Sequence, residues 1–259
     1  MSGLALITGA TSGIGAAFAE RFAADGYDLI LVGRRAERLQ RFAADHPEVA
    51  VRPVAADLAT EEGIAAVAAH CADEPLDVLV NNAGVAHYMP LADLPAAKAR
   101  EVVNVKVLAP TQLARAAVGG MLARRSGTVV NVAGMLAFSG PADAGFMPRR
   151  AVYAGALAYL VAMTQTLAAE VAGSGVRVHA VCPGVVATEF HSVQGMDLSA
   201  VPRMSAQDVV TGALRGLELG ETVSAPGVED YRLLQDAFAA DLAAFGGQRP
   251  ELASRYRAG

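Results

Sequence analysis

Short runs of apolar and β-branched residues alternate with longer stretches whose apolar residues recur at helical spacing. This alternation predicts an α/β fold in which right-handed βαβ crossovers build a doubly wound parallel sheet of about seven strands flanked by helices. The predicted strands are Leu4–Thr8, Leu29–Gly33, Val49–Ala55, Val78–Asn81, Thr128–Val132, Arg177–Cys182 and Thr222–Ala225. The predicted helices are Gly15–Asp25, Arg35–Asp45, Glu61–Cys71, Lys98–Arg124, Ala151–Ala172 and Ala206–Leu219.

Two irregular segments interrupt the alternation, at residues 134–150 and 184–201. Each follows a predicted strand, and ligands of open α/β sheets bind outside the carboxyl ends of the strands. We therefore expect these loops to form the walls and lid of a substrate cleft. No linker-like segment divides the chain, so residues 1–259 are predicted to form a single domain.

Composition and charge exclude several classes of function. The chain is 53% apolar, with a formal net charge of −5 and interspersed charges, which argues against a nucleic-acid partner. Cys71 and Cys182 lie far apart and outside any metal-ligand motif, so we expect reduced thiols and no metal site. No targeting segment and no apolar run of membrane-spanning length is recognised, which predicts a cytoplasmic protein without a membrane partner.

The first predicted turn carries three glycines in the order GxxxGxG between a strand and a helix. Gly9 suits a tight turn, Gly13 lets the backbone approach a pyrophosphate, and Gly15 lets the helix pack closely on the strand. Free N–H groups at the start of the helix favour phosphate binding. The turn therefore predicts a dinucleotide site in which Thr11, Ser12 and Ile14 also take part.

The end of the second predicted strand indicates which dinucleotide binds. A carboxylate there would bind the ribose 2′-OH of NAD, whereas this chain has Arg34 and Arg35. A guanidinium suits a 2′-phosphate, so we predict NADP(H), with Arg34 as the main contact and Ser12 or Arg35 assisting. The alternative is that both arginines are solvated residues at the start of a helix.

With these motifs the chain closely resembles the short-chain dehydrogenase/reductase family over nearly its whole length. The matching pieces are the TGATSGIG turn, Asp57-Leu58, NNAG at 81–84, Asn104-Val105, Tyr153 and Cys182-Pro183-Gly184 with Thr188. The resemblance implies a Rossmann-type fold, an oxidoreductase activity and a homodimer or homotetramer. It implies that the cofactor is bound by Asp57, Leu58, Asn81, Ala83, Gly84, Tyr153, Pro183, Gly184, Val186 and Thr188.

The catalytic residues of the family are only partly present. Asn104 and Tyr153 match the family's asparagine and tyrosine. The family's lysine lies four residues after the tyrosine, where this chain has Leu157. The family usually has a pair of serines at the end of strand five, where this chain has Ala133-Gly134. The chain is thus expected to be an atypical member that lacks the catalytic serine and lysine.

The missing lysine affects the two reaction directions differently. Tyrosine has a pKa near 10, so only about one phenol in a thousand is ionised at neutral pH. Without the cation Tyr153 stays protonated, which impairs alcohol oxidation because that direction needs a base. A neutral phenol still donates a proton, so we predict a slow or specialised carbonyl reductase acting on a small or medium carbonyl compound.

Other residues are candidates for the missing groups. Ser139 either folds back to replace the serine or is an ordinary loop residue, and Arg149 and Arg150 either bring a cation near Tyr153 or begin a solvated helix. His87 follows NNAG directly and is a candidate for catalysis or substrate contact. His191 in the second loop is a weaker candidate of the same kind.

Three functional hypotheses remain open. The first is an NADPH-dependent oxidoreductase with a carbonyl or alcohol substrate. The second is a non-redox enzyme on the same scaffold, in which Tyr153 or His87 performs acid–base chemistry. The third is a catalytically silent, NADP(H)-binding subunit that pairs with an active relative. A shared fold does not discriminate among them.

Overall fold

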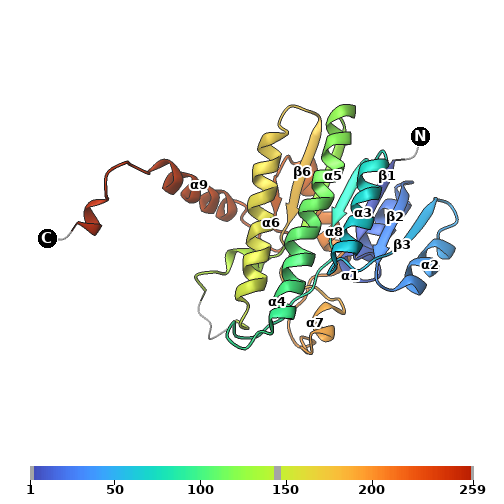
Figure 1. Cartoon of the computed structure of the whole chain (residues 1–259), viewed down its shortest axis with the longest axis horizontal. Coiled ribbons are helices and arrows are strands. Elements are labelled where there is room, and N and C mark those ends of the chain that lie inside the picture. The colour runs from blue at the N-terminus through green and yellow to red at the C-terminus, as the bar shows by residue number, and fades with distance from the viewer. Residues whose placement is uncertain (1–2, 143–146, 258–259) are drawn as a thin grey trace. The chain divides into compact units, whose positions relative to one another are not determined.

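The predicted strands form one parallel sheet in the order β3-β2-β1-β4-β5-β6-β7 (Figure 1). The structure is a computed structural model that describes residues 3–142 and 147–257. The strands are β1 (Leu4–Thr8), β2 (Asp28–Gly33), β3 (Val51–Ala55), β4 (Val78–Asn81), β5 (Gly127–Val132), β6 (Val176–Val181) and β7 (Val223–Ser224). The doubly wound α/β fold expected from the sequence is confirmed.

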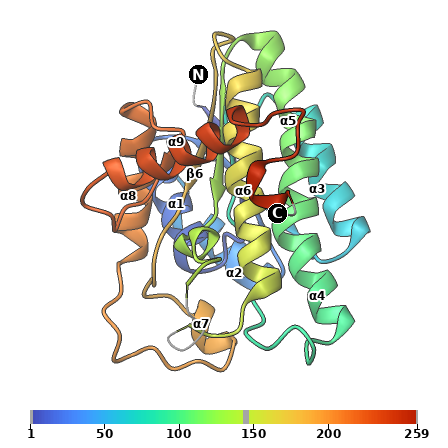
Figure 2. The same ribbon diagram turned by 90° about the vertical axis from the view of Figure 1, so that its left-hand side faces the viewer.

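Helices cover both faces of the sheet because consecutive apolar residues in the strands point to opposite sides. Ile7 of β1 packs with α1, α2 and α8, whereas Leu6 packs with α3 and α5 (Figures 1 and 2). The helices are α1 (Gly13–Ala24), α2 (Ala36–Asp45), α3 (Glu61–Asp73), α4 (Ala96–Val103), α5 (Ala109–Arg124), α6 (Ala151–Glu170), α7 (Phe190–Val193), α8 (Ala206–Glu218) and α9 (Arg232–Gly246). Shorter helical turns are η1 (Asn104–Leu108), η2 (Met135–Phe138) and η3 (Ser254–Tyr256).

A buried chain of polar side chains joins the middle of the sheet to α6. Asn81 donates from Nδ2 to Oδ1 of Asn131 at 2.9 Å, and Asn131 donates from Nδ2 to Oγ1 of Thr164 at 2.9 Å. Thr164 in turn donates to the carbonyl of Leu160 at 2.6 Å. Buried polar groups that are paired in this way fix register, so β4, β5 and α6 are held in one arrangement. The helix that carries Tyr153 is therefore tied to the sheet.

The structure corrects the sequence prediction of one continuous helix over Lys98–Arg124. Residues Asn104–Leu108 form a π-helical turn between α4 and α5. A π turn accommodates an extra residue, and such turns occur often at functional sites. The sequence prediction missed the π turn because apolar residues recur at helical spacing on both sides of it.

Helix α6 corrects a second expectation, that no apolar run reaches membrane-spanning length. By length and composition, α6 is the one candidate span among the described residues. Its buried face includes Leu157, Leu160 and Val161, and the helix packs along β6. An apolar helix in this position is typical of a helix that covers a parallel sheet.

The chain divides into two compact units, Met1–Gly227 and Val228–Gly259. The sheet and all the helices through α8 belong to the first unit. The second contains α9 and η3. The features described below all lie in the first unit.

Candidate active site

A cavity of about 870 Å³ opens at the carboxyl ends of the strands. It is lined by residues that follow β1 to β6, with both irregular loops contributing. The strand order reverses between β1 and β4, and ligands of doubly wound sheets bind at such a reversal. The volume lies within the range of about 300–1,000 Å³ that is usual for small-molecule sites.

The glycine turn forms one end of this cavity. Gly9 and Gly13 have φ angles of 67° and 57°, in the left-handed region that glycine adopts without strain. A Cβ atom on Gly15 would lie 2.3 Å from the carbonyl oxygen of Gly9 and 2.4 Å from Nδ2 of Asn82. Glycine at position 15 is therefore required for the close approach of α1 to β1. The first amides of α1 remain available to a phosphate because a helix leaves its first N–H groups without internal partners.

We expect Gly15→Ala to lower the free energy of unfolding by about 1–3 kcal/mol, since the added methyl group must displace backbone atoms. Gly119→Ala is the matched control, because a Cβ there meets nothing within 4 Å in the middle of α5. That substitution should raise stability by about 0.5–1 kcal/mol. Urea denaturation of both variants checks the opposite signs, and a neutral Gly15→Ala would contradict the tight packing.

Two arginine side chains that follow β2 line the cavity. Arg35 donates from Nη2 to Oγ1 of Thr11 and Oγ of Ser12, both at 2.8 Å, and forms a short ion pair with Glu189. Arg34 also lines the cavity, and its side chain is exposed. Arg35 is thus held in position by the turn, whereas Arg34 is open to an incoming anion.

Glu189 is a residue of this site that the sequence analysis missed. Its carboxylate also pairs with Arg38, at 3.2 Å from Nη1. The hydrogen bond from Arg35 is the main reason why the pKa of Glu189 lies below its usual value. The irregular segment after Thr188 is thereby linked to the start of α2.

Tyr153 also lines the cavity, from the first turn of α6. Its ring contacts Tyr88 edge-on at a centroid distance of 5.7 Å and stacks against Phe190 at 6.2 Å. Burial, with a smaller contribution from Tyr88, raises the pKa of Tyr153 far above its usual value. Tyr153 is therefore a neutral hydroxyl group that can donate a proton.

Leu157 and Gly134 lie side by side next to Tyr153. Leu157 is one helical turn after Tyr153, is 1% exposed and lines the same cavity. A Cβ atom on Gly134 would lie 3.4 Å from Cδ1 of Leu157. Alkyl and backbone groups thus occupy the two positions at which the family resemblance would place a lysine and a serine.

His87 forms a hydrogen-bonded pair with a glutamate in the cavity wall. Its Nε2 lies 2.8 Å from Oε2 of Glu101 on α4, and both residues line the cavity. Glu101 was not anticipated from the sequence, since the residue is separated from NNAG by a loop and half a helix. Spacing alone does not indicate such a contact.

Three other sequence candidates lie away from this cavity among the described residues. Asn104 donates from Nδ2 to the carbonyl of Ala59 at 2.6 Å within the π turn. Arg150 donates from Nε to Oγ of Ser139 at 2.8 Å, so these two side chains engage each other. None of the three lines the cavity. Their proposed catalytic roles stay predictions.

Most of the predicted cofactor residues meet at this cavity. Those that line it are Gly9, Thr11, Ser12, Gly13, Ile14, Arg34, Arg35, Asp57, Leu58, Ala83, Gly84, Tyr153, Pro183, Gly184, Val186 and Thr188. Gly15 and Asn81 lie behind it, where Gly15 packs on Gly9 and Asn81 bonds to Asn131. Among the residues that the structure describes, no group of three His, Cys, Asp or Glu side chains could hold a metal ion.

Comparison with known proteins identifies the family. A family model described as short chain dehydrogenase matches residues 3–197. Galactitol 2-dehydrogenase (L-tagatose-forming) from Cereibacter sphaeroides is 36% identical over 193 residues, which is 72% of this chain and 72% of that protein. Serine 3-dehydrogenase from Rhizobium radiobacter is 35% identical over 197 residues, or 75% of this chain and 76% of that protein.

Solved structures share the same fold. A short-chain dehydrogenase from Sphingobium yanoikuyae in complex with NADPH superposes with a TM-score of 0.92 at 30% identity, covering 98% of this chain and 100% of that one. A bulky-bulky ketone specific alcohol dehydrogenase from Comamonas testosteroni gives a TM-score of 0.86 at 26% identity, covering 98% of both chains. The chain belongs to the short-chain dehydrogenase family of oxidoreductases.

Proposed function

We propose that the protein is an NADP(H)-dependent carbonyl reductase in which Tyr153 donates the proton. The observation that carries the proposal is that the glycine turn, the two arginines and Tyr153 line the same cavity. The NADPH complex of the Sphingobium yanoikuyae dehydrogenase supports the choice of cofactor.

The residues that line the cavity fit nicotinamide adenine dinucleotide phosphate. Gly13 and α1 would hold the pyrophosphate, since glycine leaves backbone amides accessible and the helix start favours anions. Arg34, assisted by Arg35 and Ser12, would bind the 2′-phosphate. Asp57 and Gly184 would flank the two ends of the nucleotide. When bound, NADPH supplies the hydride.

The chain's own contribution to the reaction is proton transfer and exclusion of water. The phenol of Tyr153 donates its proton to the carbonyl oxygen, and Tyr88 and Phe190 cover it with apolar surface. We propose that the chain is an atypical member of the family, because Leu157 and Gly134 supply neither a cation nor a hydroxyl group here. Tyr153 therefore acts without the lysine and serine that accompany the tyrosine in the family.

The apolar wall suggests the class of substrate. Met135, Leu136, Met147, Phe190 and Leu198 line the same cavity as Tyr153. Such a surface favours ketones with bulky apolar groups over polyhydroxylated sugars. The bulky-bulky ketone specificity of the Comamonas testosteroni enzyme supports this preference. We also propose that the protein is soluble and assembles as a homodimer or homotetramer.

Loss of NADPH absorbance across a panel of aryl ketones, aliphatic ketones and keto sugars tests the function. We expect turnover with bulky aryl ketones and formation of the matching alcohol. Cofactor binding without turnover of any carbonyl would instead favour a silent subunit or a non-redox enzyme.

The raised pKa of Tyr153 predicts how alcohol oxidation depends on pH. Oxidation needs the ionised phenol, whose fraction grows about tenfold per pH unit below the pKa. Because burial raises this pKa, the rate should still be rising at pH ~10, where an unperturbed tyrosine is half ionised. Initial rates with NADP⁺ and the alcohol product check this, and a plateau near neutral pH would contradict it.

A further inference from the structure

The chain contains two lysines, Lys98 and Lys106, among 21 basic residues. Lys98 is exposed on α4. Lys106 is only 4% exposed and lies in the π turn η1. A chain that uses arginine almost everywhere thus has one of its lysines buried next to its cavity.

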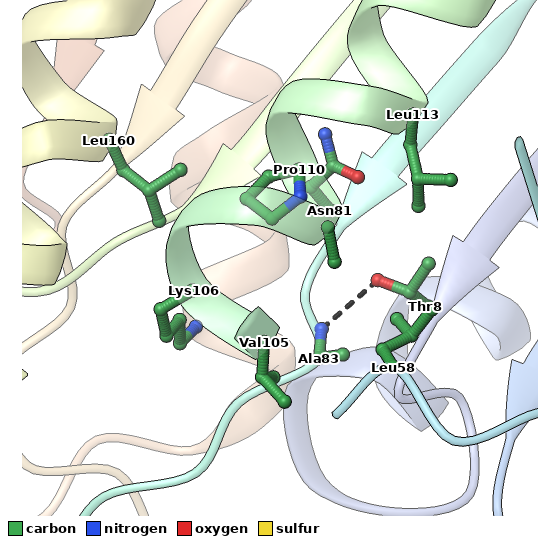
Figure 3. Close-up of a pocket in the computed structure, with 10 residues that line it drawn as sticks. Thr8, Leu58, Asn81, Ala83, Val105, Lys106, Pro110, Leu113 and Leu160 are labelled. Carbon is green, nitrogen blue, oxygen red and sulfur yellow. Dashed lines mark hydrogen bonds between the residues drawn. The ribbon is translucent and has the colours of Figure 1, made fainter. Parts of the chain in front are cut away.

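Lys106 lines the large cavity together with Tyr153, Leu157 and Gly134. It also lines a smaller cavity of about 10 Å³ together with Thr8 and Ala83. Figure 3 draws the side chains that line this smaller cavity. Its Nζ donates to the carbonyl of Val132, the last residue of β5, at 3.1 Å. A Cβ atom on Gly84 would lie 3.0 Å from Nζ, so glycine at that position gives the ammonium access to the backbone of the NNAG loop.

No carboxylate forms an ion pair with Lys106 among the described residues. An unpaired buried cation costs several kcal/mol, and a well-packed apolar residue of similar volume is often neutral or stabilising in its place. Burial lowers the pKa of Lys106 to about 8, so the side chain is still mostly charged at neutral pH. A costly charge held at the wall of a reactive cavity is typical of a functional group.

We propose that Lys106 supplies the active-site cation and reaches the nicotinamide-ribose end of bound NADPH from η1. It would replace the cationic group that Leu157 does not provide on α6. The inference rests on the proposed function, since it assumes that the dinucleotide occupies this cavity. The ammonium has three N–H donors and uses one on Val132. The others are available to hydroxyl oxygens of the ribose and to negative charge that develops on the carbonyl oxygen.

Substitution of the two lysines tests the proposal. Lys106→Met keeps the side-chain volume and removes the charge, and Lys98→Met is the matched control on the exposed face of α4. We expect Lys106→Met to weaken NADPH binding, measured by cofactor fluorescence, at least several-fold, and to slow ketone reduction about 100-fold, as for loss of an oxyanion donor. Lys98→Met should match the wild type in both measurements.

The double variant Lys106→Met/Leu157→Lys separates a functional charge from a structural hydrogen bond. It moves the cation to α6 but does not rebuild the bond to Val132. Recovery of at least tenfold of the lost rate supports the proposal. No recovery, with Tm and NADPH affinity of Lys106→Met equal to those of the wild type, would overturn it.

A readout on the unmodified protein remains informative even if the variants do not fold. Biosynthetic labelling with ¹³C-lysine gives two Cε signals, one from each lysine. Addition of NADPH should shift the Lys106 signal and leave the Lys98 signal in place. NADPH binding that leaves both signals unchanged overturns the role of Lys106, whereas absence of NADPH binding overturns the proposed function itself.

Discussion

Replacing Tyr153 by Phe is expected to slow NADPH-dependent ketone reduction by about 100- to 10,000-fold, the usual contribution of a general acid. The phenol is the proton donor buried in the cavity wall, and its high pKa keeps it protonated throughout the assay range. The ring remains in Phe, so its contacts with Tyr88 and Phe190 persist. The loss should therefore appear in kcat, while NADPH affinity changes little.

Tyr159→Phe is the control for this variant. Tyr159 lies on the same helix, but its hydroxyl bonds to Thr111 at 2.8 Å and does not line the cavity. Its removal should leave the rate within a factor of about two, as for most exposed substitutions. Equal rates for wild type and Tyr153→Phe would remove Tyr153 from the mechanism.

Arg34→Ala should weaken NADPH binding by about 10- to 150-fold, which corresponds to the loss of a hydrogen bond to a charged group. Binding of NADH should hardly change, since NADH has no 2′-phosphate. Arg35→Ala removes a guanidinium that is also bonded to Thr11 and Glu189, so part of its charge is already neutralised. We expect a smaller loss of NADPH affinity from that variant.

Fluorescence titration with both cofactors measures this selectivity. Arg41→Ala serves as the control, because Arg41 is exposed on α2 and does not line the cavity, so its loss changes net charge alone. An Arg34→Ala protein that loses NADPH and NADH affinity equally would contradict a phosphate contact. A larger loss from Arg35→Ala would move the main contact to Arg35.

Local patterns predicted the sheet and the glycine turn because each depends on neighbouring residues. Strand β1 lies at the predicted residues Leu4–Thr8, and β4 at Val78–Asn81. The turn after β1 needs glycine because its backbone adopts positive φ angles, which glycine reaches without strain. The family resemblance assigned Asp57 and Thr188 to the cofactor site, and both residues line the cavity.

Contacts between distant segments could not be predicted in the same way. The ion pair of Arg35 with Glu189 spans 154 residues, and the pair of His87 with Glu101 depends on where α4 begins. Lys106 went unnoticed because a lysine in a predicted helix is usually exposed. Lys106 instead lies in a π turn and lines the cavity, in a segment for which the sequence predicted one continuous helix.

An assay of deuterium transfer from NADPH to a ketone tests the proposed reductase activity most directly. The protein would be mixed with NADPH that carries deuterium at the transferable C4 position and with the best ketone of the panel, and the alcohol analysed by mass spectrometry. We predict one deuterium at the carbinol carbon, with the rate of its formation lowered about 100-fold or more in Tyr153→Phe and retained in Tyr159→Phe. An alcohol without deuterium, or no alcohol from a protein that binds NADPH, would contradict the account.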